Sequence, residues 1–174
     1  MNTKTKILFN ALGFQLGWWL SVLGVMWNMP LLGPVYMALF LVAHHFLLAG
    51  NKEFYLILIA GFGGTLLDSL YTRSGMLSYE GGYGHFWLAP LWITAMWVGF
   101  TATLNHALSW LEKRPLLGFA AGAVFGPLSY ISGQKLGVIS FNWDLLPASA
   151  VLALAWGLAI PILYFLNRKL VAER

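Results

Sequence analysis

The chain lacks cysteine and has little charge. None of its 174 residues is cysteine, which excludes a disulfide framework, a thiolate metal site and a cysteine nucleophile. Only 9% of the residues are charged, whereas 59% are hydrophobic. The isoelectric point is about 9.5, but the ten Lys and Arg are scattered among apolar stretches and form no basic stripe. The composition therefore excludes a soluble globular domain and argues against a nucleic-acid partner.

Several motifs of known chemistry are also missing. The sequence has no Walker loop, no dinucleotide-binding glycine fingerprint after a strand, no nucleophile elbow and no row of arginines. No zinc-binding spacing such as HExxH occurs, and the histidines show no pairing typical of haem ligands. ATP-driven transport by this chain alone is therefore not expected, and we predict neither a cofactor nor a metal.

What the chain does have is long apolar runs, with a mean hydropathy of +0.72. Crossing a membrane takes about 20 apolar residues, and six stretches approach this length. They are approximately residues 6–27, 33–50, 54–72, 87–111, 116–136 and 146–166. The first is too long for the core of a signal peptide, so we interpret it as a retained span. We predict a single all-α domain over residues 1–174, a bundle of six transmembrane helices.

The basic residues predict the orientation of this bundle. Eight of the ten fall on one side: Lys4, Lys6, Lys52, Lys113, Arg114, Arg168, Lys169 and Arg174. Arg73 and Lys135 fall on the other. Because loops rich in Lys and Arg stay in the cytoplasm, both termini are predicted to be cytoplasmic.

Small residues at a spacing of four predict where the helices pack. Gly118, Gly122 and Gly126 share one face of a predicted helix. Such stripes let helix backbones approach closely within a membrane. Pro127 and Pro161 lie inside predicted helices and should bend them.

Polar side chains inside the predicted spans fall into two layers. The inner layer comprises Asn10, His44, His45, Asn105 and His106, and the outer layer comprises Asp68, Arg73, Tyr130 and Gln134. Gln15 lies between the two layers. Each polar group costs a few kcal/mol in hydrocarbon, so it should face the bundle interior and have a partner. Arg73 or Lys135 could neutralise Asp68. The loop over residues 73–85 adds Tyr79, Glu80 and His85.

These residues allow a functional and a structural interpretation. A carboxylate within a membrane usually has a functional role, which we expect for Asp68. The alternative for Asp68 is a structural salt bridge. His106 and one of the neighbouring pair His44 and His45 could also form hydrogen bonds between helices and have no role in catalysis. Candidate catalytic residues are Asp68, His106 and Tyr130. Candidate substrate-binding residues are Asn10, Gln15, His44, His45, Arg73, Asn105 and Gln134.

Four motifs in order carry a family resemblance: "NALGFQLGWWLSVLG", "LLDSLYTRSGMLSY", "LAPLWITAMWVGFTATLNHALSWL" and "GPLSYISGQKLG". They resemble the small proteobacterial inner-membrane proteins of the family called domain of unknown function 2878 (DUF2878), over nearly the whole chain. The resemblance implies a multi-pass protein of the bacterial inner membrane. Genes for fatty-acid or cyclopropane-lipid modification often neighbour those of the family, which implies a role with membrane lipids. The name of the family assigns no activity.

Three functions remain open at this point. The first is a lipid-modifying enzyme or accessory factor with a polar cavity inside the membrane. The second is a transporter or flippase for a small molecule, an ion or a lipid, in which the proline kinks supply movement. The third is a non-catalytic scaffold whose glycine stripes serve a homo-oligomer or a membrane partner.

Overall fold

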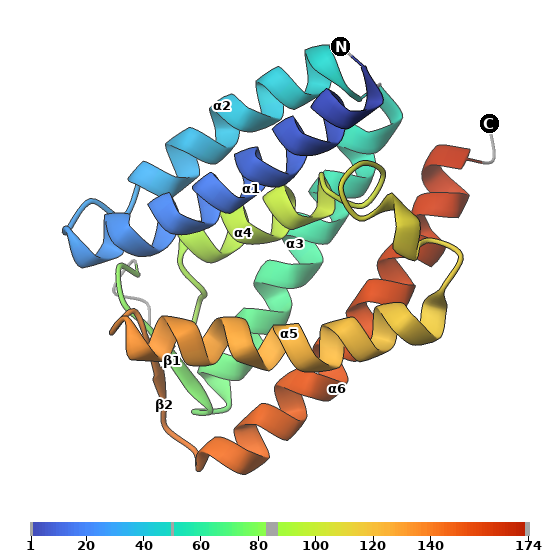
Figure 1. Cartoon of the computed structure of the whole chain (residues 1–174). Helices are drawn as coiled ribbons and strands as arrows, with labels where there is room; N and C mark the ends of the chain where they lie inside the picture. Colours follow the sequence, from blue (N-terminus) through green and yellow to red (C-terminus); the bar gives the residue numbers. More distant parts are fainter. Residues whose placement is uncertain (1, 50, 83–86, 173–174) are drawn as a thin grey trace.

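The computed structural model describes residues 2–49, 51–82 and 87–172 (Figure 1). The described part contains six α-helices: α1 (Thr3–Met26), α2 (Leu32–Leu47), α3 (Asn51–Arg73), α4 (Leu91–Thr101), α5 (Pro115–Lys135) and α6 (Leu145–Asn167). Two strands, β1 (Leu77–Tyr79) and β2 (Ile139–Phe141), a 3₁₀ turn (Ser109–Leu111) and a terminal π turn (Arg168–Ala172) complete it. The prediction of an all-helical protein is confirmed, with one small antiparallel β-ladder added.

Local chemistry explains where several elements begin and turn. The Asn2 side chain accepts a hydrogen bond from the Thr5 backbone amide and caps α1. Pro115 opens α5, where its missing amide proton costs nothing. Between α1 and α2, Asn28 adopts a φ of 58°, a left-handed conformation that asparagine tolerates in turns.

Four helices are long and apolar enough to cross a membrane: α1, α3 from Glu53 onward, α5, and α6 with the turn that follows it. The helices α2 and α4 are apolar but shorter, with 16 and 11 residues. At about 1.5 Å per residue, α4 is about 16 Å long. The continuous helix predicted over residues 87–111 is therefore not what the structure shows.

The helix breaks off after Thr101 because polar side chains compete for its backbone. The Thr103 hydroxyl donates to the Phe100 carbonyl at 2.6 Å, and the Ser109 hydroxyl donates to the His106 carbonyl at 2.9 Å. Such local bonds favour turns over a continuing helix. Residues 102–108 consequently form a series of turns.

The helices form two groups joined by α3. Helices α1, α2 and α4 pack together, α5 pairs with α6, and α3 contacts both α4 and α6 (Figure 1). The start of α1, the end of α2, the start of α3 and the end of α6 lie at one end of the bundle (Figure 1). The β-ladder lies at the opposite end, where Leu77 pairs with Phe141 and Tyr79 with Ile139.

The glycines of α5 bring it close to α6, as their spacing predicts. A Cβ atom added at Gly122 would lie 2.2 Å from the Trp156 carbonyl oxygen, and one at Gly126 would lie 2.5 Å from the Trp156 side chain. Only glycine therefore permits this approach of the two backbones.

Candidate functional site

A buried carboxyl group with three hydrogen-bond donors forms the first polar cluster, the Asp68 cluster. Asp68 Oδ1 accepts from the Tyr79 hydroxyl at 2.6 Å and from the Tyr130 hydroxyl at 2.7 Å. Asp68 Oδ2 accepts from the Trp97 indole nitrogen at 2.7 Å. Asp68 is fully buried, and an indole can only donate. The three donors therefore take the place of water around the carboxyl group.

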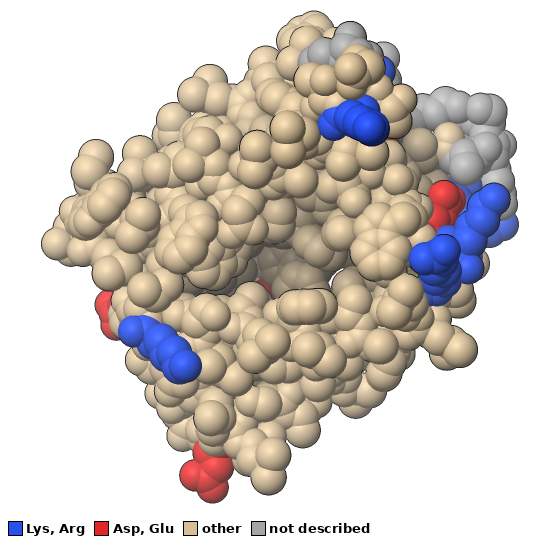
Figure 2. Space-filling view, viewed as in Figure 1, with Lys and Arg blue, Asp and Glu red and all other residues tan. Residues whose placement is uncertain are grey.

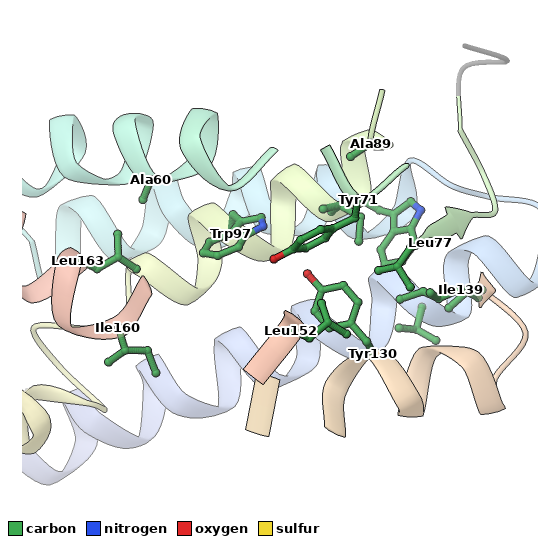
Figure 3. Packing of buried hydrophobic residues seen from close by; sticks show 14 of the residues in the cluster. Ala60, Tyr71, Leu77, Ala89, Trp97, Tyr130, Ile139, Leu152, Ile160 and Leu163 are labelled. Carbon is green, nitrogen blue, oxygen red and sulfur yellow. The ribbon is translucent and has the colours of Figure 1, made fainter. Parts of the chain in front are cut away.

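Four different parts of the chain bring these groups together. Asp68 belongs to α3, Trp97 to α4, Tyr130 to α5 and Tyr79 to β1. Figure 3 shows the Trp97 nitrogen and the Tyr130 hydroxyl pointing toward a common spot, and the Tyr71 hydroxyl points there as well. The Tyr71 hydroxyl has no hydrogen-bond partner among the described residues.

Tyr79 is the member of the cluster that comes from outside the helices. Burial, followed by the neighbouring Asp68 carboxylate, raises the pKa of the Tyr79 hydroxyl well above its usual range. The hydroxyl therefore stays protonated and keeps donating to Asp68. The pairing of β1 with β2 holds Tyr79 in this position.

A cavity of about 640 Å³ lies directly beside the Asp68 cluster. Both Trp97 and Tyr130 belong to its wall, so two of the three donors to Asp68 separate the carboxyl group from the cavity. Figure 2 shows a deep hollow between the side formed by α1 and α4 and the side formed by α5, with acidic atoms visible far inside. The cavity volume is within the range of small-molecule sites.

The wall of the cavity is mainly apolar and rich in aromatic side chains. Trp97 and Trp156 stack with their ring centres 4.4 Å apart, and Phe100 meets Trp156 edge to face at 5.4 Å. Six tryptophans contribute to the wall: Trp18, Trp19, Trp92, Trp97, Trp110 and Trp156. Polar side chains in the wall include Gln15, Ser129 and Tyr130. Such a wall suits an apolar ligand that carries few polar groups.

A second polar cluster, the Glu53 cluster, lies on the side where α2 ends and α3 begins. Glu53 Oε2 lies 3.1 Å from His44 Nε2 and 3.3 Å from His106 Nε2. The two imidazole rings meet edge to face with centroids 4.9 Å apart. Asn10 Nδ2 lies 3.4 Å from His44 Nδ1. The cluster thus joins α1, α2, α3 and the turns after α4.

Asn10 also forms hydrogen bonds with the backbone where α4 ends. Its Nδ2 donates to the Ala102 carbonyl at 2.9 Å, and its Oδ1 accepts from the Ala107 amide at 3.1 Å. These two backbone groups fix the orientation of the amide. An interrupted helix in an apolar environment needs such partners, since unpaired backbone groups are costly there.

The same turns receive further support from α6. Asn105 and Asn167 exchange two side-chain hydrogen bonds of 3.0 and 2.7 Å. The Tyr164 hydroxyl donates to the Leu108 carbonyl at 2.6 Å. Asn105 therefore joins the turns to α6, whereas His106, its neighbour in sequence, faces Glu53.

Several predicted site residues lie apart from both clusters. His45 is half-buried with its ring against Phe46, and Gln134 is exposed. Arg73 and Lys135 are exposed as well, and the groups that contact Asp68 are uncharged side chains instead. His85 lies outside the described residues.

Sequence reasoning missed Glu53 and Trp97 as members of the polar clusters. Glu53 stands in the charged break before α3 and looked like part of a connecting loop. Trp97 looked like one more apolar position within a span. Glu53 did carry a signal, since it lies in the first turn of α3 and the apolar run of that helix begins directly after it.

The fold and the two clusters define a class of protein: a bundle of apolar helices around an aromatic cavity, with buried polar groups at its side. Residues 7–162 match the family described as "Protein of unknown function (DUF2878)". The chain belongs to this family. Neither a curated protein nor a solved structure matches the chain.

Proposed function

We propose that the chain is a multi-pass protein of the bacterial inner membrane that takes the apolar part of a membrane lipid into the aromatic cavity. Six apolar helices would lie in the bilayer with both termini on the cytoplasmic side. The uneven distribution of basic residues supports this orientation. The protein acts as a lipid-modifying enzyme or as an accessory factor in membrane lipid metabolism.

One observation carries this proposal: a cavity of about 640 Å³ with an aromatic wall has Tyr130 in that wall, hydrogen-bonded to a buried carboxyl group. The wall would hold an acyl chain through apolar contact. The mouth opens between α1 and α5, so a lipid could enter sideways from the bilayer (Figure 2).

Tyr130 and Asp68 supply the acid–base chemistry in this proposal. The Tyr130 hydroxyl borders the cavity and donates its proton to Asp68 Oδ1. A proton taken from a bound lipid would reach the Tyr130 oxygen while the Tyr130 proton moves to the Asp68 carboxylate, and the electron pair of the broken bond would stay on the lipid. His106 lies in the Glu53 cluster and not in the cavity wall, so its role is separate from this step.

The experiment compares the lipids of a deletion strain with those of strains that carry the wild-type protein or a variant. Tyr130→Phe and Asp68→Asn should give the lipid profile of the deletion strain. Gln134→Ala should restore the wild-type profile, because this side chain is exposed and is not in the cavity wall. Protein levels in the membrane are measured for every variant.

The result that overturns the proposal is a lipid profile that stays unchanged on deletion, both in normal growth and under stress. If Asp68→Asn and Tyr130→Phe restore the wild-type phenotype fully while Gly122→Leu does not, a scaffold is the better interpretation. Gly122 sits at the closest contact of α5 with α6 but also belongs to the cavity wall. Gly157→Leu, at the same contact and outside that wall, therefore tests packing alone.

A second candidate, lipid transport, is favoured by the prolines beside the cavity. Pro127 lies inside α5 next to Gly126, and Pro161 lies inside α6 next to Ile160. Gly126 and Ile160 both belong to the cavity wall. Prolines lower the cost of bending a helix, which would let the mouth open and close. Reconstituted vesicles in which the protein moves a fluorescent lipid between leaflets, without changing it chemically, would select this candidate.

A further inference from the structure

The Glu53 cluster places three ligand atoms of the kind that hold metal ions around one point. His44 Nε2, His106 Nε2 and one Glu53 carboxylate oxygen all lie within 4.8 Å of one another. Both histidines approach the same oxygen, Oε2. The three residues come from α2, α3 and the turns after α4, so only the fold brings them together.

Two of the three separations between these atoms match a tetrahedral coordination shell. Zinc binds nitrogen and oxygen at about 2.0–2.1 Å, which places neighbouring ligand atoms about 3.3 Å apart. The two nitrogen-to-oxygen distances in the cluster are 3.1 and 3.3 Å. The third separation, between the two Nε2 atoms, is within 4.8 Å, so a metal ion can lie between the three atoms once the two imidazole rings move closer together.

We propose that His44, Glu53 and His106 bind one divalent transition-metal ion, such as zinc, through both Nε2 atoms and the Glu53 carboxylate. Two imidazoles favour zinc or a similar first-row ion over magnesium or calcium, which prefer oxygen ligands. This inference concerns a different part of the molecule from the lipid cavity and does not depend on the proposed function.

The cluster is accessible from one edge. The side chains of Glu53 and His106 are 12% and 13% exposed, whereas that of His44 is 1% exposed. An ion can enter along the edge formed by Glu53 and His106. Three protein ligands leave a fourth coordination position for water or another ligand, as in three-ligand zinc sites.

Asn10 limits the affinity of this site. Binding through Nε2 moves the proton of a neutral His44 to Nδ1, which faces the Asn10 amino group. The backbone groups of Ala102 and Ala107 hold the Asn10 amide in this orientation. The contact between Asn10 and His44 is 3.4 Å long and weak, but metal binding replaces it with two N–H donors that face each other, and this cost lowers the affinity.

The test uses the full chain, purified in detergent without a polyhistidine tag and stripped of metal with a chelator. Cobalt(II) is titrated as a spectroscopic probe, and zinc content is measured by elemental analysis after dialysis. We expect one ion per chain and a visible absorption spectrum of low-symmetry, four-coordinate cobalt. Glu53→Gln and His106→Ala should each weaken binding by at least about 100-fold.

His45→Ala is the matched control, because His45 is adjacent to His44 but its ring packs against Phe46. It should bind cobalt like the wild type. Glu53→Gln keeps a carbonyl oxygen that can accept an imidazole N–H, so it separates lost coordination from lost folding. Thermal unfolding of each metal-free protein checks the fold.

The proposal is overturned if the wild type binds neither cobalt nor zinc in a one-to-one ratio. It is also overturned if folded Glu53→Gln or His106→Ala binds as tightly as the wild type, or if His45→Ala loses binding to the same extent as they do. Should His106→Ala fail to fold, Glu53→Gln alone decides the outcome.

Discussion

Two neighbouring tyrosines, of which only one donates a hydrogen bond to Asp68, allow a sharp test of the Asp68 cluster. Tyr130 and Tyr71 are equally buried, with 5% of each residue exposed, and their rings meet edge to face at 6.4 Å. The Tyr130 hydroxyl donates to Asp68 at 2.7 Å. The Tyr71 hydroxyl has no partner among the described residues. Replacing each tyrosine by phenylalanine removes the same single oxygen atom from a similar environment.

The two substitutions should change the free energy of unfolding in different ways. A hydrogen bond to a charged group contributes about 1.5–3 kcal/mol. Because Tyr79 still donates to Asp68 Oδ1 when Tyr130 is replaced, we expect Tyr130→Phe to cost about 2 kcal/mol. Tyr71→Phe removes a hydroxyl whose burial is uncompensated, so we expect no change or a gain of about 1 kcal/mol.

Reversible unfolding in mixed micelles, with the fraction of sodium dodecyl sulfate as the denaturing variable, measures both values. Intrinsic tryptophan fluorescence reports the transition, since Trp97 belongs to the cluster. Equal losses of stability for Tyr71→Phe and Tyr130→Phe would refute the assignment of donors around Asp68. A loss for Tyr71→Phe alone would show that the wrong tyrosine has been assigned to the carboxyl group.

Three further predictions concern packing, the interrupted helix and ionisation. Gly122→Ala should cost about 1–3 kcal/mol, because its Cβ would lie 2.2 Å from a backbone oxygen of α6. Gly63→Ala, whose Cβ meets nothing within 4 Å, should gain up to about 1 kcal/mol in the same unfolding assay, and equal effects would contradict the packing argument. Asn10→Leu leaves a buried carbonyl and a half-buried amide unpaired, at up to about 1–3 kcal/mol each. Residues 102–108 should therefore exchange their amide hydrogens faster, and unchanged exchange would contradict this role of Asn10. The raised pKa of Tyr79 stabilises the folded state fully below about pH 10, where a free tyrosine begins to ionise, and this contribution is lost as the pH rises further. In an ultraviolet absorbance titration, Tyr79→Phe should therefore leave the number of phenols that ionise near pH 10 unchanged, and a decrease by one would show that Tyr79 ionises normally.

Much of the helical architecture follows from local sequence patterns. The predicted stretches 6–27, 116–136 and 146–166 agree with α1, α5 and α6 to within a few residues. Long apolar runs bounded by polar turns mark helix ends directly, because hydropathy is a property of neighbouring residues. The spacing of the glycines in α5 likewise predicts the face that meets α6.

For the stretch 87–111, local hydropathy does not predict the structure correctly. Its hydropathy predicts one long helix, but α4 ends at Thr101. Whether an apolar segment stays helical depends on partners for its backbone groups. Here Asn10 of α1 and Tyr164 of α6 supply those partners, and both are remote in the sequence.

The sequence by itself determined that the chain is helical and apolar, and it indicated which polar residues lie at similar heights along neighbouring helices, since rise per residue and hydropathy are local quantities. It also placed Asp68 level with Tyr130, and Asn10 level with His44. Only the tertiary structure decided that Trp97 and Tyr79 complete the donors to Asp68, and that Glu53 joins His44 to His106. These partnerships depend on how each helix is rotated about its axis. That rotation is set by packing across the whole bundle.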